Sequence, residues 1–285
     1  MSNQKIEQPV EKIKETVEQA ARVESAPAPE RRYRAILFRG TLFVIAGAFA
    51  VLTFLVKTIP SFTIDLQVTK AIQMINFPFF NMVMVWVSWP GFGPQNMIIA
   101  GLIILFIWMI GLHWEAVMAL AAALFSTAIN LLVKDLIQRP RPTATQVTVI
   151  DLLNSYSFPS GHVMFYLGFF GFIGFLAFTL LKPSLKRSLI LFVVGILIIL
   201  IGISRISLGE HWASDVLGAY LLSSLTLVAI IQFYIWGKTR FFVHQPVAAA
   251  AATPEQPKKE LPTATAHGAV EKLSGKRRVI HGEEK

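Results

Sequence analysis

Six apolar stretches, separated by short polar segments, dominate the middle of the chain. They occupy residues 37–56, 97–112, 114–133, 163–181, 189–203 and 216–236. A helix needs about 20 mostly apolar residues to cross the hydrocarbon core of a bilayer, and the shorter stretches reach that length with their flanks. The pattern therefore predicts an all-α, polytopic membrane protein built as a six-transmembrane-helix bundle.

A further apolar segment, residues 78–89, is too short to count with these six. It lies between Phe77-Pro78 and Pro90-Gly91, and it carries Trp86 and Trp89. Tryptophan is enriched where a membrane meets water. We interpret the segment as a short interfacial or re-entrant helix before the second span. The alternative, a seventh span, would place the two termini on opposite faces of the membrane.

Composition excludes an ordinary soluble protein. Of 285 residues, 54% are hydrophobic and only 15% are charged, whereas charged residues make up about a quarter of a soluble domain. The chain has no cysteine, which excludes disulfides, a thiol nucleophile and a cysteine-ligated metal. Its net charge of +9 would indicate nucleic acid in a soluble protein, but in this chain it fits cytoplasmic flanks and anionic lipid better.

Charged residues are concentrated at the two ends of the chain. Residues 1–34 hold 7 basic and 6 acidic side chains, and residues 238–285 hold 9 basic and 5 acidic. We predict two polar, largely disordered cytoplasmic tails over these ranges, on either side of a membrane domain at 35–237. Residues 6–23 allow a short surface helix, although a solvated tail is favoured, and no cleavable signal peptide is visible in residues 1–30.

Lysine and arginine in the short flanks predict the orientation. They lie before the first span, between the fourth and fifth, and after the sixth: Arg31, Arg32, Arg34, Arg39, Lys182, Lys186, Arg187, Lys238 and Arg240. Positive loops stay in the cytoplasm. We therefore predict a multi-pass protein of the inner (plasma) membrane with both termini in the cytoplasm.

The opposite face should be poor in positive charge, yet it carries four basic residues: Lys134, Arg139, Arg141 and Arg205. Three clusters of polar residues lie on this face, at residues 134–142, 158–162 and 204–215, and the four basic residues belong to the first and the third. With six spans all three clusters meet the same membrane surface, so we expect them to converge. Either these cations hold an anionic ligand, or they reach to lipid phosphates as interfacial anchors.

The remaining residues of the clusters favour an active site. Lys134, Arg141 and Arg205 suit phosphate oxygens, and Ser160 and the Gly161 amide add neutral donors. His211 and Asp215 are four residues apart and would share a helical face, where a carboxylate can fix the imidazole tautomer for nucleophilic attack. His162 is a second imidazole for proton transfer. Singly each residue has a structural interpretation, such as a helix cap for Ser160, but the combination does not.

The three clusters resemble the signature motifs of the type 2 phosphatidic acid phosphatase (PAP2) superfamily. The pattern K-x6-R-P matches Lys134 to Pro142, and P-S-G-H matches Pro159 to His162. The pattern S-R-x5-H-x3-D matches Ser204 to Asp215. The resemblance implies a six-helix membrane bundle of the PAP2 or haloperoxidase-like type, with its site at the outer leaflet.

The resemblance also implies a mechanism. His211 would attack phosphorus to form a phosphohistidine, Asp215 would orient it, and His162 would protonate the leaving oxygen before water releases phosphate. The transition state would be stabilised by the remaining motif residues: Lys134, Arg141, Ser160, Gly161 and Arg205. No metal or other cofactor is needed. Arg139 competes with Arg141 for the motif position, but the spacing selects Arg141, and we interpret Glu210 as exposed.

We therefore expect a lipid phosphatase whose substrate keeps its apolar tail in the membrane. Candidate substrates are undecaprenyl diphosphate, phosphatidylglycerophosphate and phosphatidic acid. The alternatives are a lipid phosphotransferase using the same phosphohistidine, a non-enzymatic anion transporter, and a vanadate-dependent haloperoxidase, whose soluble nature the six spans argue against. No nucleic-acid partner is expected, and the sequence leaves the oligomeric state open.

Overall fold

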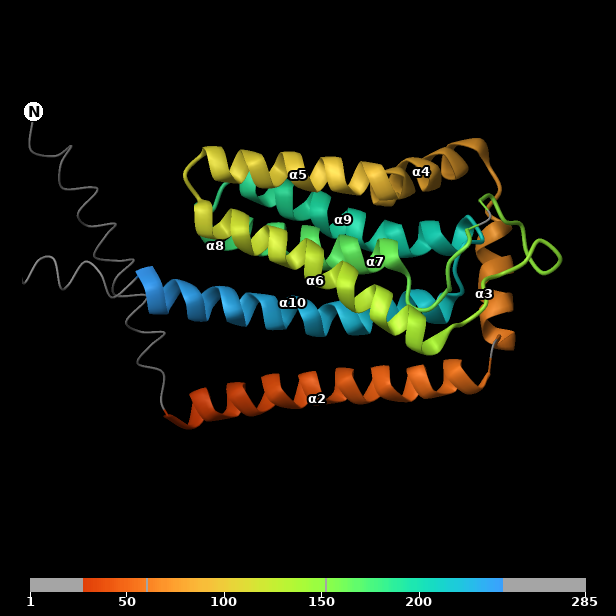
Figure 1. Ribbon diagram of the computed structural model, residues 1–285, viewed down its shortest axis with the longest axis horizontal. Coiled ribbons are helices and arrows are strands. Elements are labelled where there is room, and N and C mark those ends of the chain that lie inside the picture. The colour runs from red at the N-terminus through yellow and green to blue at the C-terminus, as the bar shows by residue number, and fades with distance from the viewer. Residues whose placement is uncertain (1–27, 60, 152, 243–285) are drawn as a thin grey trace, which may run out of the picture. The chain divides into compact units, whose positions relative to one another are not determined.

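The computed structural model describes residues 28–59, 61–151 and 153–242 of the chain, and within them all regular secondary structure is helical (Figure 1). The elements in order are α2 (Ala28–Thr58), α3 (Thr63–Gln73), α4 (Pro78–Ser88), the 3-10 turn η1 (Trp89–Gly91), α5 (Gly93–Met109), α6 (His113–Ile137), α7 (Gly161–Phe165), the π-helical turn η2 (Tyr166–Phe170), α8 (Gly171–Leu180), α9 (Leu185–Ser207) and α10 (Ala213–Phe242). This confirms the all-α, polytopic fold.

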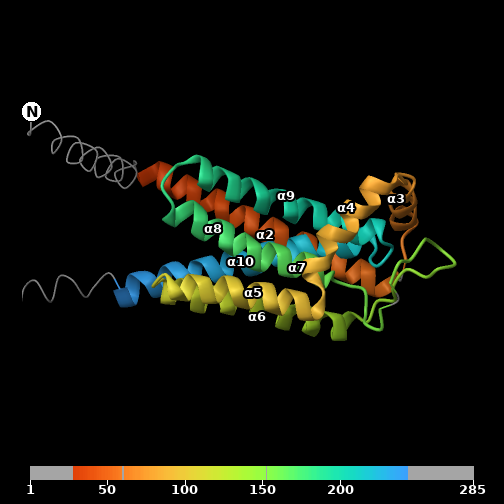
Figure 2. The ribbon, with the colours of Figure 1, turned by 90° about the horizontal axis from the view of Figure 1, so that it is seen from above.

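Among the described residues, five helical segments are long and apolar enough to cross a membrane: Arg32–Thr58, His113–Ile137, Gly161–Leu180, Leu185–Ser207 and Ala213–Phe241. The predicted second span corresponds to α5, which is apolar but has 17 residues. At 1.5 Å per residue it is about 25 Å long. It runs beside α6 in both views (Figures 1 and 2), so it completes a bundle of six helices.

The segment ahead of α5 is a pair of short helices. α3 and α4 meet at an angle of 120°. The 11 residues of α4 extend about 16 Å, roughly half of a bilayer core. This agrees with the predicted short helix before the second span. Side-chain bonds fix α4 to the bundle, since the Ser204 hydroxyl donates to the Met84 carbonyl at 2.6 Å and the Tyr166 hydroxyl donates to that of Val87 at 2.6 Å.

The first helix contacts the bundle mainly through a few residues. Most of α2 is exposed, as at Phe43 and Phe54, which suits contact with lipid chains. In its second half, the Phe49 ring stacks on the Phe158 ring at a centroid distance of 6.1 Å. The Lys57 ammonium donates to the Leu136 carbonyl at 2.9 Å and thereby caps the last turn of α6.

The elements that carry the three clusters end at the same side of the bundle. The end of α6, the start of α7, the end of α9 and the start of α10 lie together near α3, opposite the start of α2 (Figure 1). The connection from α6 to α7 crosses this side. The Gln73 amide fixes it by donating to the Thr148 carbonyl at 2.7 Å and accepting from its N–H at 3.1 Å. Gly209 must lack a side chain here, because its φ is +70° and a Cβ would lie 2.0 Å from the Thr148 oxygen.

Much of the predicted tails, including the possible surface helix at residues 6–23, lies outside the described residues. The three-part division at residues 34/35 and 237/238 therefore stays a prediction.

Candidate active site

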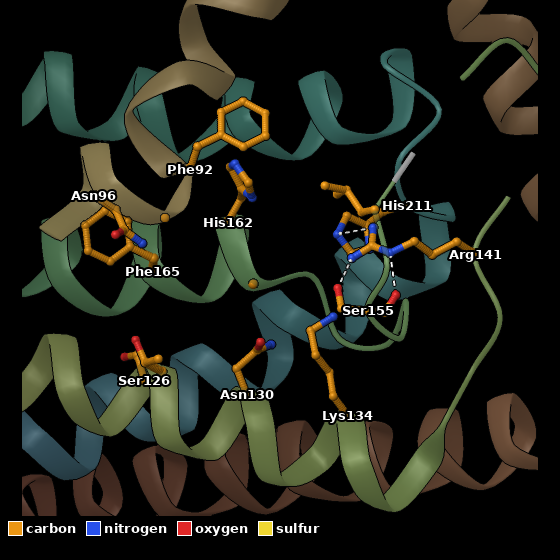
Figure 3. Close-up of a pocket in the computed structure, with 15 residues that line it drawn as sticks. Phe92, Asn96, Ser126, Asn130, Lys134, Arg141, Ser155, His162, Phe165 and His211 are labelled. Carbon is orange, nitrogen blue, oxygen red and sulfur yellow. Dashed lines mark hydrogen bonds between the residues drawn. The ribbon is translucent and has the colours of Figure 1, made fainter. Parts of the chain in front are cut away.

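The three clusters meet around one pocket of about 350 Å³ (Figure 3). Five of the eight predicted site residues line it: Lys134, Arg141, Gly161, His162 and His211. The other three, Ser160, Arg205 and Asp215, are fully buried and contact the lining residues or their neighbours from behind. The backbone of the first cluster directs Arg141 toward the pocket. Gln138 adopts a left-handed conformation (φ 57°) that ends α6, so the chain is no longer helical where it reaches Arg141.

The contacts of His211 distinguish its two nitrogens. Arg141 Nη1 lies 3.3 Å from Nε2. A guanidinium can only donate, so this contact is favourable when Nε2 carries a lone pair and the proton resides on Nδ1. Nδ1 faces Ser157 Oγ at 3.5 Å and Asp215 Oδ2 at 3.6 Å. The arrangement leaves Nε2 as the nitrogen directed at the cationic side chains.

His211 and Asp215 approach one another differently from the prediction. His211 precedes α10, which begins at Ala213, so the pair does not share a helical face. Instead Asp215 Oδ2 accepts from the Trp212 N–H at 2.9 Å, which folds the chain back at the start of the helix. The Ser157 hydroxyl also donates to Oδ2 and so bridges the carboxylate and the imidazole. The predicted proximity holds, but the helical explanation was wrong.

The electrostatic surroundings keep His211 uncharged. Burial lowers its pKa well below the ordinary 6.5, and the positive charges of Arg141, Lys134 and Arg205 lower it further. Burial also lowers the pKa of Arg141, to about 10, which leaves the guanidinium charged at neutral pH. At neutral pH the pocket therefore combines a neutral imidazole with a positive guanidinium.

Backbone carbonyls hold two of the cations in place. Arg141 donates to the Ser155 carbonyl at 2.7 Å and its hydroxyl at 2.9 Å, and to the Glu210 carbonyl at 2.6 Å. The Lys134 ammonium donates to the Tyr156 carbonyl. Because these carbonyls leave the positive charges unneutralised, the groups can still attract an anion.

Arg139 is a buried supporting residue and does not line the pocket. Its Nη1 contacts Asp215 Oδ1 at 2.5 Å, and its Nη2 contacts Asp65 Oδ2 at 2.8 Å. Asp65 also accepts from the Ser214 N–H at 2.8 Å and from its hydroxyl at 2.6 Å. Arg139 therefore connects α3 to the carboxylate behind His211, which agrees with the choice of Arg141 as the residue that faces the pocket.

The prediction that Glu210 is exposed was wrong. Glu210 is 1% exposed and forms an ion pair with Arg205, which is itself completely buried. Arg205 also donates to the Ser88 hydroxyl and lies over the Phe92 ring, 5.5 Å from its centroid. The burial has a physical reason, since a buried guanidinium needs a counter-charge in a low-dielectric site.

The second cluster begins α7 as expected. Ser160 is the N-cap residue, yet its hydroxyl makes no capping bond and is a buried group without a hydrogen-bond partner among the described residues. The His162 ring packs edge-on against Phe92 at a centroid distance of 4.9 Å. Gly91 permits this approach, because a Cβ there would lie 2.2 Å from His162 Cδ2. His162 Nε2 is likewise buried without a partner in the described part of the chain, so it can still donate or accept a proton.

Sequence reasoning missed several residues that border or support the pocket, among them Asp65, Asn96, Asn130 and Ser157. A signal existed for Asn130, since it lies one helical turn before Lys134 in an otherwise apolar span. The described residues contain no group of three or more His, Asp or Glu side chains placed to hold a metal ion.

Comparison with known proteins gives a consistent result. Residues 113–239 match the model of the PAP2 superfamily. Phosphatidylglycerophosphatase B of Bacillus subtilis (strain 168) is 27% identical over 175 residues, which cover 59% of this chain and 82% of that protein. Sphingosine-1-phosphate phosphatase 2 of Homo sapiens is 32% identical over 107 residues, covering 35% of this chain and 25% of that one.

A solved structure shares the fold. The crystal structure of the transmembrane PAP2 type phosphatidylglycerolphosphate phosphatase from Bacillus subtilis matches with a TM-score of 0.60 at 26% identity. The match covers 67% of this chain and 94% of that chain. All eight predicted site residues fall inside the matched family segment, whereas Asp65 and Asn96 lie outside it.

Proposed function

We propose that this chain, a membrane phosphatase of the PAP2 superfamily, hydrolyses a lipid phosphate through a phosphohistidine on His211. The observation that carries the proposal is the environment of this imidazole. Its Nε2 faces Arg141 at 3.3 Å inside the pocket, and its Nδ1 faces Ser157 and the buried carboxylate of Asp215. This is what a nitrogen nucleophile needs, namely an unprotonated nitrogen and an acceptor for the opposite N–H.

In the first step Nε2 of His211 attacks phosphorus and the bond to the leaving oxygen breaks. His162, which is protonated in the complex because the anionic phosphate offsets the nearby cations, gives its proton to that oxygen, which departs as an alcohol. The imidazole becomes positively charged as the N–P bond forms, and the Asp215 carboxylate balances that charge. Negative charge on the equatorial phosphate oxygens is stabilised by Lys134 and Arg141 from the pocket wall.

In the second step a water molecule attacks the phosphohistidine. The now neutral His162 accepts a proton from the water, the N–P bond breaks, and inorganic phosphate leaves with His211 neutral again. Arg205, Ser160 and the Gly161 amide complete the phosphate cradle in this proposal. No step is assigned to a metal ion.

The substrate is proposed to be a lipid, because the pocket lies among helices of membrane-spanning length. The Bacillus subtilis relative is named as a phosphatidylglycerophosphatase and the human relative as a sphingosine phosphate phosphatase. Both names describe lipid phosphomonoesters. They support phosphatidylglycerophosphate and phosphatidic acid as first substrates to test, with undecaprenyl diphosphate as the diphosphate candidate, and they favour hydrolysis over anion transport.

A substrate panel in detergent tests the function. The purified protein should release phosphate from at least one of the three lipids, with equal rates in the presence and absence of EDTA. His211→Ala should release none and should not trap radiolabelled phosphate in an acid-quenched reaction. Turnover by that variant would refute the mechanism, and loss of wild-type activity in EDTA would refute its metal-free form. Appearance of the label on an added alcohol would instead identify a phosphotransferase.

We further propose that the pocket faces the outside of the plasma membrane. The start of α2, the connection from α8 to α9 and the end of α10 lie at the side of the bundle opposite the end of α6 (Figure 1). These segments carry basic flanks that include Arg32, Lys182 and Lys238. Positive flanks favour the cytoplasm. Because the chain has no cysteine, single-cysteine variants at exposed positions report topology directly. A membrane-impermeant maleimide should label Ala144→Cys but not Lys182→Cys in intact cells, and the reverse pattern would invert the orientation.

A further inference from the structure

The pocket has two regions of different chemistry, and the proposed reaction uses only one of them. The cationic region contains Lys134, Arg141 and His211. The second, here called the neutral region, is lined by uncharged residues: Phe92, Asn96, Ser126, Thr127, Asn130 and Phe165. Figure 3 shows His162 between them, with Asn96 and Ser126 on the side away from Arg141.

Along one face of α6, the side chains that line the pocket change from charged to uncharged. Ser126, Asn130 and Lys134 are spaced by four residues, so their side chains lie along one side of the helix. All three are buried. The eight residues from Lys134 to Ser126 correspond to about 12 Å along the helix axis. Uncharged polar groups therefore continue into the bilayer beyond the phosphate cradle, where polar side chains are costly and usually functional.

On the wall of the pocket opposite α6, helix α5 contributes a polar group that the proposed reaction does not use. Asn96 extends from the first turns of α5, and its buried Oδ1 has no hydrogen-bond partner in the described part of the chain. On α6, Asn130 Nδ2 donates to the Pro159 carbonyl at 3.0 Å. An unpaired buried polar atom destabilises a protein, so Asn96 Oδ1 beside the cavity needs a partner, which a bound ligand or water can supply.

The position of the proposed proton donor, His162, identifies which part of a ligand would occupy the neutral region. This step rests on the proposed function, in which His211 attacks and His162 protonates the leaving oxygen. The leaving group must then depart from phosphorus on the side of His162, away from His211. Beyond His162 lies the neutral region, bounded by Asn96 and Ser126.

We propose that the neutral region is a leaving-group subsite in which Asn96 and Ser126 pair with uncharged oxygens of the alcohol being released. Amide and hydroxyl groups both donate and accept, which suits the ester and hydroxyl oxygens of a glycerol-type alcohol. A diphosphate lipid would instead place a second, charged phosphate there, among lining residues without a positive charge. The subsite therefore selects phosphomonoesters of oxygen-rich alcohols over lipid diphosphates.

The test compares two substrates in one variant. Asn96→Leu keeps the approximate size of the side chain and removes its amide, and Met97→Leu, at a residue 74% exposed and outside the pocket, is the matched control. Wild type should have a higher kcat/KM for phosphatidic acid than for farnesyl diphosphate. Asn96→Leu should lower kcat/KM at least tenfold for phosphatidic acid and no more than twofold for the diphosphate, and Met97→Leu should change neither.

Ser126→Ala provides a second measurement if Asn96→Leu does not fold, and it should change the same ratio in the same direction. Equal losses on both substrates would mean a merely structural role and would overturn the subsite. An unchanged ratio, or a wild-type preference for the diphosphate, would overturn it as well. A wild-type protein that hydrolyses neither of these lipids nor phosphatidylglycerophosphate would refute the proposed function itself, so the two failures are distinguishable.

Discussion

Arg139 binds Asp215 through a buried ion pair, with 2.5 Å between Nη1 and Oδ1. The second arm of the same guanidinium contacts Asp65 at 2.8 Å. A single arginine thus lies between the carboxylate that orients the proposed nucleophile and a short helix that the family segment does not include. The short helices before the second span are therefore connected to the site through charge as well as packing.

Asp65→Asn should lower both stability and turnover. The new amide nitrogen would face donors of Arg139 and Ser214 in a buried site, and breaking such a pair typically destabilises a protein by about 3–5 kcal/mol. We expect a lower thermal unfolding temperature and a kcat reduced about tenfold, with little change in KM because the cations proposed to bind phosphate remain. Lys70→Gln, on the exposed face of the same helix, is the control and should behave as wild type. Wild-type kcat in a destabilised Asp65→Asn would limit Asp65 to a structural role.

Ser157→Ala tests the bridge between the carboxylate and the imidazole. Without the hydroxyl, Asp215 Oδ2 is left 3.6 Å from His211 Nδ1, beyond normal hydrogen-bond length. Bonds to charged groups contribute about 1.5–3 kcal/mol, so kcat should fall by roughly 10- to 100-fold. Stopped-flow measurement of phosphoenzyme formation should show the loss in the first step. Ser224→Ala, which removes a local bond within α10, is the control, and equal activities in the two variants would argue against the bridge.

The spans and the motif residues could be predicted because each depends only on the local order of residues in the sequence. Apolar length defines a span, and fixed spacing defines K-x6-R-P. The partners of those residues depend on folding. Arg139 meets Asp65 across 74 residues, and nothing near Asp65 in the sequence indicates that contact. Nδ1 of His211 contacts Ser157, which lies in the irregular connection between α6 and α7. Such a connection has no hydrophobic periodicity from which the contact could be predicted.

Glu210 shows a different limit. Charged residues are mostly exposed, so a glutamate next to a proposed anion site was interpreted as facing water. Its burial depends on the completely buried Arg205, and the sequence does not reveal which arginine needs a counter-charge. Pairing of buried charges follows from packing in three dimensions.

The acid limb of the pH profile should lie below pH 6.5. In the proposed mechanism the reactive form of His211 is neutral, and burial with nearby cations lowers its pKa, so protonation should remove activity only at lower pH. Activity should therefore persist at pH 6.5, the ordinary pKa of an imidazole, and fall only as the pH decreases further. Arg141→Gln removes one of those cations and should move the acid limb of kcat/KM upward, together with a higher KM. Comparing the variants on one substrate cancels the ionisation of the substrate itself, and an acid limb that does not move would contradict this electrostatic coupling.

Glu210→Gln should strengthen anion binding while weakening the fold. The carboxylate of Glu210 neutralises Arg205 beside the phosphate cradle, so its removal raises the positive potential there. Inorganic phosphate and orthovanadate should then inhibit several-fold more tightly. The same change leaves a buried guanidinium without its partner, which should destabilise the protein by about 3–5 kcal/mol. Inhibition constants and thermal unfolding separate the two effects. Glu115→Gln, which breaks the partly buried pair with Lys238 instead, is a control that should affect stability alone. Weaker vanadate inhibition in Glu210→Gln would show that Glu210 orders Arg205 for binding rather than restraining its charge.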